Sequence, residues 1–170
     1  MPSYTSDVKG LRTFEAFKLV KDESVWVAVG KTAQWNETET VPQVTEGTTL
    51  QELVALKRAD QVAFVVPDPN GTIEQQGQKW KIISEQEAKS IDCRWVYIQV
   101  WLNYDQFPVV TYRQTGIYTG LALKPGVPAN KQIITISDVA DLGFFIVANN
   151  RSPIPREATQ KESIEFIIEF

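Results

Sequence analysis

The chain has 170 residues, a length typical of one globular domain. Its hydrophobic fraction of 43% and charged fraction of 22% are those of an ordinary globular protein with a sizeable core. The net charge of −4 at pH 7 disfavours nucleic acid and anionic membranes as partners, because both would repel a weakly acidic surface.

Histidine is absent from the sequence, and cysteine occurs once, as Cys93. A lone cysteine excludes an internal disulfide framework, and the lack of histidine removes the commonest general base and metal ligand. We therefore expect no catalytic residue, no metal site, no cofactor and no small-molecule substrate. The sequence also lacks a run of signal-peptide type and an apolar stretch long enough to cross a bilayer, so we expect a soluble protein made in the cytoplasm.

The first half of the chain alternates short apolar segments with polar connections. A loose amphipathic stripe predicts a helix over residues 10–21, with Leu11, Phe14, Phe17, Lys18 and Val20 on the stripe. Alternating valines predict a strand over residues 24–30, and a further strand is expected at 61–66. Between them, a Thr/Glu-rich loop covers residues 36–49, and a capping box at 49–52 predicts a helix running to about Lys57.

A turn at residues 67–71 is indicated by the Asn70-Gly71 pair, which readily adopts positive φ values. The chain is then expected to return as a strand at residues 79–83, followed by a polar turn or a helical piece around residues 85–90. The small Cys93 side chain is expected to be buried.

The strand predicted at residues 94–102 is the centre of the fold. Its sequence sends one set of apolar residues to one face and Trp95, Tyr97, Gln99 and Trp101 to the other, with the period of two that a pleated strand imposes. Since both faces are largely apolar, we expect this strand to be covered on both sides. The first set is Val96, Ile98, Val100 and Leu102.

The second half of the chain is dominated by strand patterns. Gly116 and Gly120 indicate bulges or a close approach of two backbones. In the last strand, Ile164, Phe166, Ile168 and Phe170 are expected to face inward and Glu165 and Glu169 outward. Residues 151–161, which contain prolines, are expected to form a surface loop. The expected strands lie at residues 109–113, 116–123, 132–136, 143–148 and 162–170.

About eight short strands with two or three short helices predict a mainly β (α+β), β-sandwich-like fold, in one domain over residues 1–170. Two functional classes fit such a chain on residue chemistry alone. Nine of the ten tryptophan and tyrosine residues, at positions 26, 35, 80, 95, 97, 101, 104, 112 and 118, could form a carbohydrate-stacking platform or anchor a protein interface. A histidine-free hydrolase that uses paired carboxylates ranks third, because the acidic residues concentrate in segments expected to be solvated.

A resemblance to a known family adds to this interpretation. It is carried by the strand Arg94-Trp95-Val96-Tyr97-Ile98, by Tyr112-Arg113-Gln114-Thr115-Gly116, by Asn149-Asn150-Arg151-Ser152-Pro153-Ile154, and by the final strand from Gln160 to Phe170. In these segments the chain resembles the C-terminal half of a baseplate wedge protein of T4-like contractile-tailed bacteriophages. In that subunit an Asn-Arg-x-Pro-Ile loop precedes a Gln-x-Glu strand ending in phenylalanine. The segment from Gly30 to Trp35 resembles that family's early Gly-basic-x-x-x-Trp segment.

The resemblance implies a structural, non-enzymatic subunit of the virion tail baseplate, made in the host cytoplasm. It further implies that the protein joins wedge components, anchors tail-fibre proteins, or both. Its expected partners are other wedge and fibre-adaptor proteins and a second copy of itself, as a dimer within a six-fold assembly.

We expect the partner contacts in the two polar loops, 36–49 and 151–161. Both are poor core material, and they carry opposite charges that could pair between subunits. Both loops are expected to be mobile in the isolated chain. The candidate contact residues are Trp35, Glu37, Glu39, Glu46, Arg151, Arg156 and Lys161.

Overall fold

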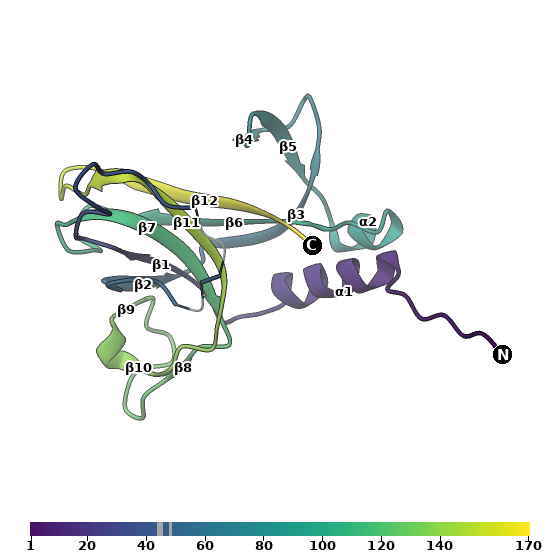
Figure 1. Ribbon diagram of the computed structural model, residues 1–170, viewed down its shortest axis with the longest axis horizontal. Helices are drawn as coiled ribbons and strands as arrows, with labels where there is room; N and C mark the ends of the chain where they lie inside the picture. Colours follow the sequence, from purple (N-terminus) through teal and green to yellow (C-terminus); the bar gives the residue numbers. More distant parts are fainter. Residues whose placement is uncertain (44–45, 48) are drawn as a thin grey trace. The chain divides into compact units, whose positions relative to one another are not determined.

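The computed structural model describes residues 1–43, 46–47 and 49–170, and in this part of the chain strands predominate (Figure 1). The helical elements are α1 (Lys9–Val20), α2 (Glu85–Ser90) and the 3-10 helix η1 (Ile136–Asp138). The strands are β1 (Val25–Gly30), β2 (Ala55–Arg58), β3 (Gln61–Pro67), β4 (Ile73–Gln75), β5 (Gln78–Ile82), β6 (Trp95–Leu102), β7 (Thr111–Thr119), β8 (Ala122–Leu123), β9 (Ile133–Ile134), β10 (Val139–Asp141), β11 (Phe144–Pro155) and β12 (Glu162–Glu169). The predicted mainly β (α+β) fold class is confirmed.

The chain forms two compact units, each assembled from segments that are separate in sequence. Unit 1 contains Met1–Asp22, Gln61–Gln99 and Glu165–Phe170, and unit 2 contains Glu23–Asp60 and Val100–Ile164. The boundary falls within β6 and β12, so each of these strands contributes residues to both units. The single domain expected over residues 1–170 remains a prediction.

Unit 1 is built on a sheet with the strand order β12-β6-β3-β5-β4. Strands β3 and β6 are antiparallel, with Gln61 opposite Gln99 and Phe64 opposite Val96. The helix α1 contacts β3, where the rings of Phe17 and Phe64 lie 4.6 Å apart. The two helices of this unit lie side by side and are joined by an ion pair (Figure 1).

The predicted N-terminal helix is present, but its buried face differs from the predicted one. Thr13, Ala16 and Leu19 are buried, whereas Leu11 is 42% exposed and Phe14 is 60% exposed. Small residues at positions 13 and 16 allow the helix to approach its neighbours closely. The larger Leu11 and Phe14 side chains therefore remain on the outer side.

The strand expected at the centre of the fold is confirmed as β6, which has neighbours on both edges. Its predicted inner face, Val96, Ile98, Val100 and Leu102, is completely buried. The opposite face is covered less evenly, because Tyr97 is buried but Trp101 is 38% exposed.

Glu165 was expected on a solvated face of the last strand, and this expectation is wrong. Its carboxylate accepts hydrogen bonds from Tyr97 Oη at 2.8 Å, Gln99 Nε2 at 3.0 Å and Gln75 Nε2 at 2.7 Å. Three polar side chains of unit 1 therefore converge on one carboxylate. A buried tyrosine needs a hydrogen-bond acceptor, and Glu165 supplies it.

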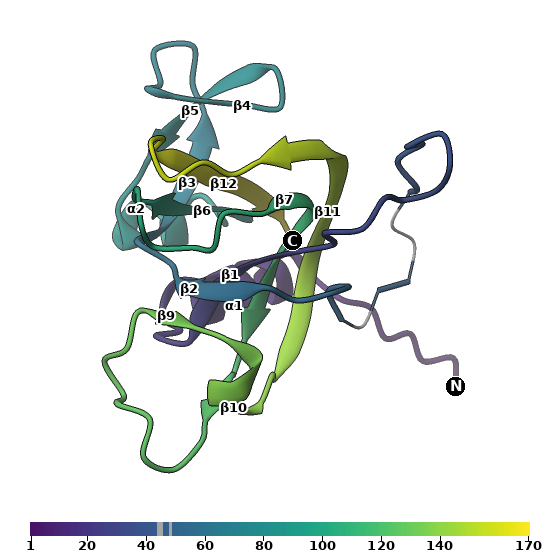
Figure 2. The same ribbon diagram turned by 90° about the vertical axis from the view of Figure 1, so that its left-hand side faces the viewer.

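Unit 2 contains a sheet with the order β11-β7-β1-β2-β9 and the small pair β10-β8. Strand β1 is inside the sheet, with Ala28 opposite Leu56 of β2 and Gly116 of β7 (Figure 2). One of the clusters that form its core contains Trp26, Leu56, Tyr118 and Ile134, with Phe145 packed against it.

The helix predicted from the capping box at residues 49–52 is wrong, because residues 51 and 52 form a turn and β2 begins at Ala55, within the predicted helix. The backbone N–H of Leu50 donates to Tyr118 Oη at 2.8 Å, and that of Gln51 donates to Gln114 Oε1 at 2.8 Å. Side chains of β7 thus take the amide groups that would start a helix. Residues 55–58 then complete the backbone hydrogen bonding of β1.

The two strands predicted at residues 109–113 and 116–123 form one continuous strand, β7, followed by the short β8. Gly116 lies within it and marks a close approach, as predicted: a Cβ there would lie 2.4 Å from the Phe145 ring and 2.6 Å from the Val147 carbonyl oxygen. Gly120, at φ +68°, marks the end of the strand.

The loop predicted at residues 151–161 is partly strand, because β11 continues to Pro155. Its pairing with β7 places Asn150 opposite Gln114 and Ile154 opposite Tyr112, with a register shift between them. β11 is an edge strand, where prolines are tolerated because one side of the strand has no neighbouring strand to pair with. The strand predicted at 132–136 is divided into β9 and η1, which Thr135 and Asp138 cap.

Candidate partner-binding site

The connection from β1 to β2 provides the site. Residues 31–43 of this connection, here called the anchored loop, leave β1 at Gly30 and form neither helix nor strand. The predicted loop at 36–49 overlaps it, and residues 44, 45 and 48 of that prediction lie outside the described part of the chain.

Arg113 of β7 holds the middle of the anchored loop. Its Nη2 donates to Glu39 Oε1 at 2.7 Å, and its Nε lies 3.0 and 3.1 Å from the two carboxylate oxygens of Glu39. Its Nη1 donates to the carbonyl oxygen of Thr32. Arg113 is only 7% exposed, so one buried guanidinium fixes two points of the loop.

A second anchor lies at the start of the loop. Lys31 has φ +56°, and its N–H donates to the Gln51 carbonyl oxygen at 2.7 Å. The Glu52 carboxylate accepts from Lys31 Nζ and from the Ala33 N–H, both at 3.2 Å. The two ends of the β1–β2 connection are therefore joined by backbone and charged hydrogen bonds.

Trp35 and Asn150 join the anchored loop to β11. Trp35 Nε1 donates to the Arg151 carbonyl oxygen at 3.0 Å, and Asn150 Nδ2 donates to the Pro42 carbonyl oxygen at 2.9 Å. Gln114 Nε2 donates in turn to Asn150 Oδ1 at 2.7 Å. The start of the predicted second loop therefore lies against the first, and the mobility that we expected for both loops remains a prediction.

The tip of the anchored loop is organised by Asn36. Its Oδ1 accepts from the N–H groups of Thr38 and Thr40, both at 3.0 Å, and its Nδ2 donates to the Thr40 carbonyl oxygen at 2.9 Å. Glu37 lies in this tip, and its side chain is exposed. Local hydrogen bonds thus give the tip a defined shape while its carboxylate faces solvent.

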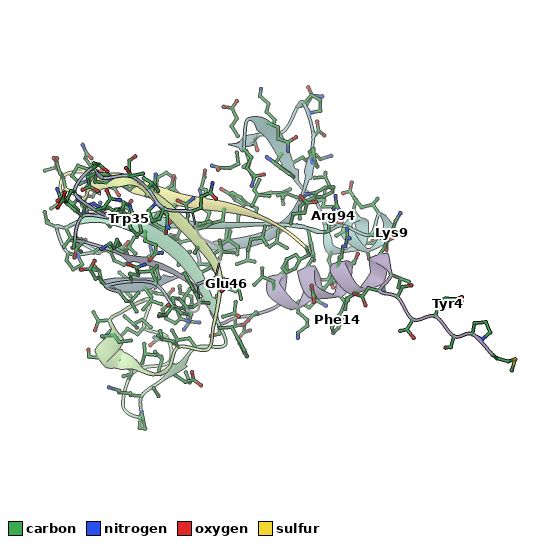
Figure 3. The ribbon with its side chains drawn as sticks, in the orientation of Figure 1. Tyr4, Lys9, Phe14, Trp35, Glu46 and Arg94 are labelled. Atoms are coloured by element: carbon green, nitrogen blue, oxygen red, sulfur yellow. The ribbon has the colours of Figure 1, made fainter. Side chains whose placement is uncertain are left out.

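The candidate contact residues do not form one charged cluster. Glu37 and Glu46 are exposed, while Trp35 and Arg151 are half-buried. Figure 3 shows Trp35 and Glu46 in separate places within unit 2. Glu39 is used internally by Arg113.

Arg156 and Lys161 of the second loop differ in their exposure. Arg156 is 2% exposed; it donates to the carbonyl oxygens of Asn103 and Gln160 and lies 3.5 Å from Glu162 Oε1. Lys161 is exposed, with its Nζ 4.8 Å from the centre of the Trp101 ring. Only Lys161 of this pair is free to meet a partner's charge.

The anchoring contacts also shift acid–base equilibria. The hydrogen bonds from Arg113 lower the pKa of Glu39, and the hydrogen bond from Lys31 lowers the pKa of Glu52, in each case against a smaller opposing effect of desolvation. Both carboxylates therefore stay ionised at neutral pH. Burial, with a further contribution from Glu162, raises the pKa of Tyr112 to about 12.

The aromatic residues are distributed mainly through the core. Trp26 and Trp80 are 1% and 2% exposed, and Trp35 and Trp95 are half-buried. Trp101 is the most exposed tryptophan, and Lys161 covers its ring. A carbohydrate platform needs several exposed rings in one shallow groove, and the five tryptophans do not provide it.

Comparison with known proteins decides the family. The model of the family described as "Baseplate wedge 3 tail fiber network component" matches residues 4–170. The chain belongs to this family. It is also 26% identical to "Virion protein 3" of Enterococcus phage phiEF24C over 155 residues, which cover 87% of this chain and 84% of the relative.

Membership of the baseplate wedge family confirms the resemblance found in the sequence, and with it the expected place in the phage virion. In the described residues, no helix is long and apolar enough to span a membrane. The same residues contain no group of three or more acidic or cysteine side chains arranged to hold a metal ion.

The residues that anchor the loop were not predicted from the sequence. Arg113 and Gln114 form a polar pair inside a strand, and Asn150 lies within the segment that resembled the wedge family. Arg113 could have been recognised, because a charged residue flanked by strand residues that become buried must find a partner. The identity of that partner, Glu39, has no signal in the sequence.

Proposed function

We propose that the protein is a non-enzymatic connector of the phage baseplate, which joins wedge components and anchors tail-fibre proteins. The description of its family, as a tail fiber network component, supports this role. We further propose that it works as a homo-oligomer, a dimer within a six-fold assembly.

The observation that carries the proposal is the anchored loop with its defined, exposed tip. Binding through a mobile loop costs conformational entropy when the loop becomes ordered. Arg113, Glu52 and Asn150 hold residues 31–43 before any partner arrives, so most of this cost is met on folding. Preorganisation of this kind suits a subunit that must join its neighbours in one orientation.

The charge of the exposed residues indicates the kind of partner. Glu37 at the tip and Glu46 beyond it are exposed carboxylates. We propose that they meet a basic surface of a neighbouring baseplate protein, and that Trp35, Arg151 and Lys161 border the contact. Exposed charges of this type mainly determine orientation and association rate.

Complementation of a phage that lacks this protein tests the proposal. Glu37→Lys should fold normally but reduce the number of complete baseplates seen by electron microscopy, and the infectious titre, by about tenfold or more. Glu74→Lys, in β4 of unit 1, is a matched charge reversal and should assemble normally. Full assembly with Glu37→Lys and Glu46→Lys combined would show that the anchored loop is not a partner contact.

A further inference from the structure

The N-terminal segment of unit 1 exposes a row of apolar side chains. Residues 1–8, here called the arm, form neither helix nor strand, and every one of them is exposed. Tyr4 is 93% exposed and Val8 72% exposed, and the row continues on α1 with Leu11 and Phe14. Leu11 and Phe14 are three residues apart, which places them on one side of α1, and Val8 immediately precedes this helix. A contiguous row of this kind marks an interaction surface.

A groove in the same unit lies beside this row. It has a volume of about 910 Å³, and both α1 and α2 contribute to its walls. Phe14 and Phe17 provide its apolar surface, and Lys18 Nζ lies 5.7 Å from the centre of the Phe14 ring. Three lysines and three acidic residues complete the lining, so its charges balance.

We propose that this groove receives the arm of a second copy of the chain. In the resulting dimer each copy places Tyr4 and Val8 of its arm in the partner's groove, against Phe14 and Phe17. Such an exchange is self-complementary, because the same two surfaces are used twice around a two-fold axis. It also covers the apolar row that each copy alone leaves in water.

The dimensions and charges of the arm fit this occupant. Eight extended residues span up to about 26–29 Å, whereas a helix of twelve residues such as α1 is about 18 Å long. Among residues 1–8, Asp7 is the only charged side chain. A segment with so little charge suits a groove lined equally by both signs, whereas a strongly charged partner would meet repulsion from half of that lining.

The direction of the arm favours exchange between copies over folding back. Figures 1 and 2 show that the arm leaves the N-terminal end of α1 and extends away from the helix. Figure 3 shows Tyr4 on the projecting arm and Phe14 on α1. Val8 has an extended backbone, with φ −119° and ψ 166°, so the chain does not turn back toward its own groove at this point.

The proposed function includes a dimer of this chain, and the exchange of arms supplies the interface of that dimer. The inference therefore rests on the proposed function. The two are tested separately, because the interface lies in unit 1 and the anchored loop in unit 2. Dimerisation is measured on the purified chain, in the absence of any other baseplate protein.

Sedimentation equilibrium of the purified full-length chain tests the interface. The wild-type chain should form a reversible dimer, and Tyr4→Asp and Phe14→Asp should each raise its dissociation constant by about tenfold or more. Tyr104→Asp and Phe144→Asp replace the same residue types at positions that are 55% and 73% exposed in unit 2, and should leave the constant unchanged. Tyr4 makes the cleaner test, since the arm takes no part in the fold.

Disulfide trapping separates exchange from folding back. The double variant Tyr4→Cys/Lys18→Cys should give a covalent dimer on mild oxidation, while Cys93 is 1% exposed and should not react. The proposal is overturned if the wild-type chain is monomeric at every concentration, or if Tyr4→Asp and Phe14→Asp dimerise like their controls. It is equally overturned if the double variant forms its disulfide within a single chain.

Discussion

Arg113 and Glu39 are 74 residues apart in sequence and form the central contact of the anchored loop, with Arg113 Nη2 2.7 Å from Glu39 Oε1. Arg113 belongs to an inner strand and is 7% exposed, while the Glu39 side chain is 26% exposed. A rigid sheet thereby determines the position of a polar loop that has no core of its own.

Replacing Arg113 should release the loop. In Arg113→Ala, both Glu39 and the Thr32 carbonyl oxygen lose their donor, so hydrogen exchange of the amides in residues 31–43 should accelerate by about tenfold or more. Mass-spectrometric hydrogen exchange on the purified chain would measure it.

Arg151→Ala is the matched control for that experiment. Arg151 contributes its carbonyl oxygen to Trp35, and this group survives the substitution. Exchange in residues 31–43 should therefore stay at the wild-type rate. Equal protection in Arg113→Ala and the wild-type chain would show that the loop does not depend on Arg113.

The same contact predicts a loss of anchoring in acid. Hydrogen bonds from Arg113 lower the pKa of Glu39 in the folded chain below its ordinary value of 4.5. A lowered folded pKa means that the unfolded chain binds the proton more readily, so this contribution to stability is complete above the ordinary value. It is lost as the pH falls through the folded pKa.

Exchange of the anchored loop's amides should accordingly increase over the pH interval below the ordinary value of 4.5, after correction for intrinsic rates. In Glu39→Gln the loop should already be less protected at pH 7, and its protection should change less over the same interval. The Glu52 carboxylate titrates in the same direction, so a residual change is expected in this variant. A wild-type chain with pH-independent protection would contradict the assignment.

The elements that could be predicted from the sequence are those determined by local pattern. The alternation of side chains in residues 95–102 correctly predicted β6 and its buried face. The cluster of proline, aspartate, asparagine and glycine at residues 67–71 correctly predicted a turn. The capping box at 49–52 failed because its signal is also local, whereas Tyr118 and Gln114 compete for the same amide groups from a distant strand. The hydrogen bonds to Tyr118 and Gln114 therefore outweighed the local preference of residues 49–52 for starting a helix.

Charged side chains were the least predictable part of the site. Arg156 was expected to face a partner because it lies in a polar, proline-containing segment, yet its guanidinium is buried against three backbone carbonyl oxygens. Long side chains can turn inward from a loop, and the sequence around them does not record the direction. Glu37 and Lys161, by contrast, are exposed as their surroundings suggest.

Arg156 is therefore predicted to support the fold. Arg156→Met leaves the carbonyl oxygens of Asn103 and Gln160 without their donor and removes the cation beside Glu162, so unfolding free energy should fall by about 3 kcal/mol. Lys161→Met, whose ammonium lies over the Trp101 ring, should change it by about 1 kcal/mol or less. Urea denaturation would compare the two; similar stabilities would contradict the structural role of Arg156.

Gly116 offers the most direct test of the packing between β7 and β11. A Cβ at this position would lie 2.4 Å from a Phe145 ring atom and 2.6 Å from the Val147 carbonyl oxygen, and the second contact cannot be relieved by turning a side chain. Gly116→Ala should therefore lower the unfolding free energy by about 1–3 kcal/mol.

Gly10→Ala is the control for Gly116→Ala, because the same substitution is expected to raise the unfolding free energy at position 10. Gly10 lies in the first turn of α1, and no atom comes within 4 Å of an added Cβ. Because alanine loses less conformational entropy in a helix, this variant should be more stable by up to about 1 kcal/mol. Both variants can be measured by the same urea titration. If Gly116→Ala also proves neutral or stabilising, β11 must shift away from β7 at little cost, and the two strands are not packed as closely as the Phe145 and Val147 distances require.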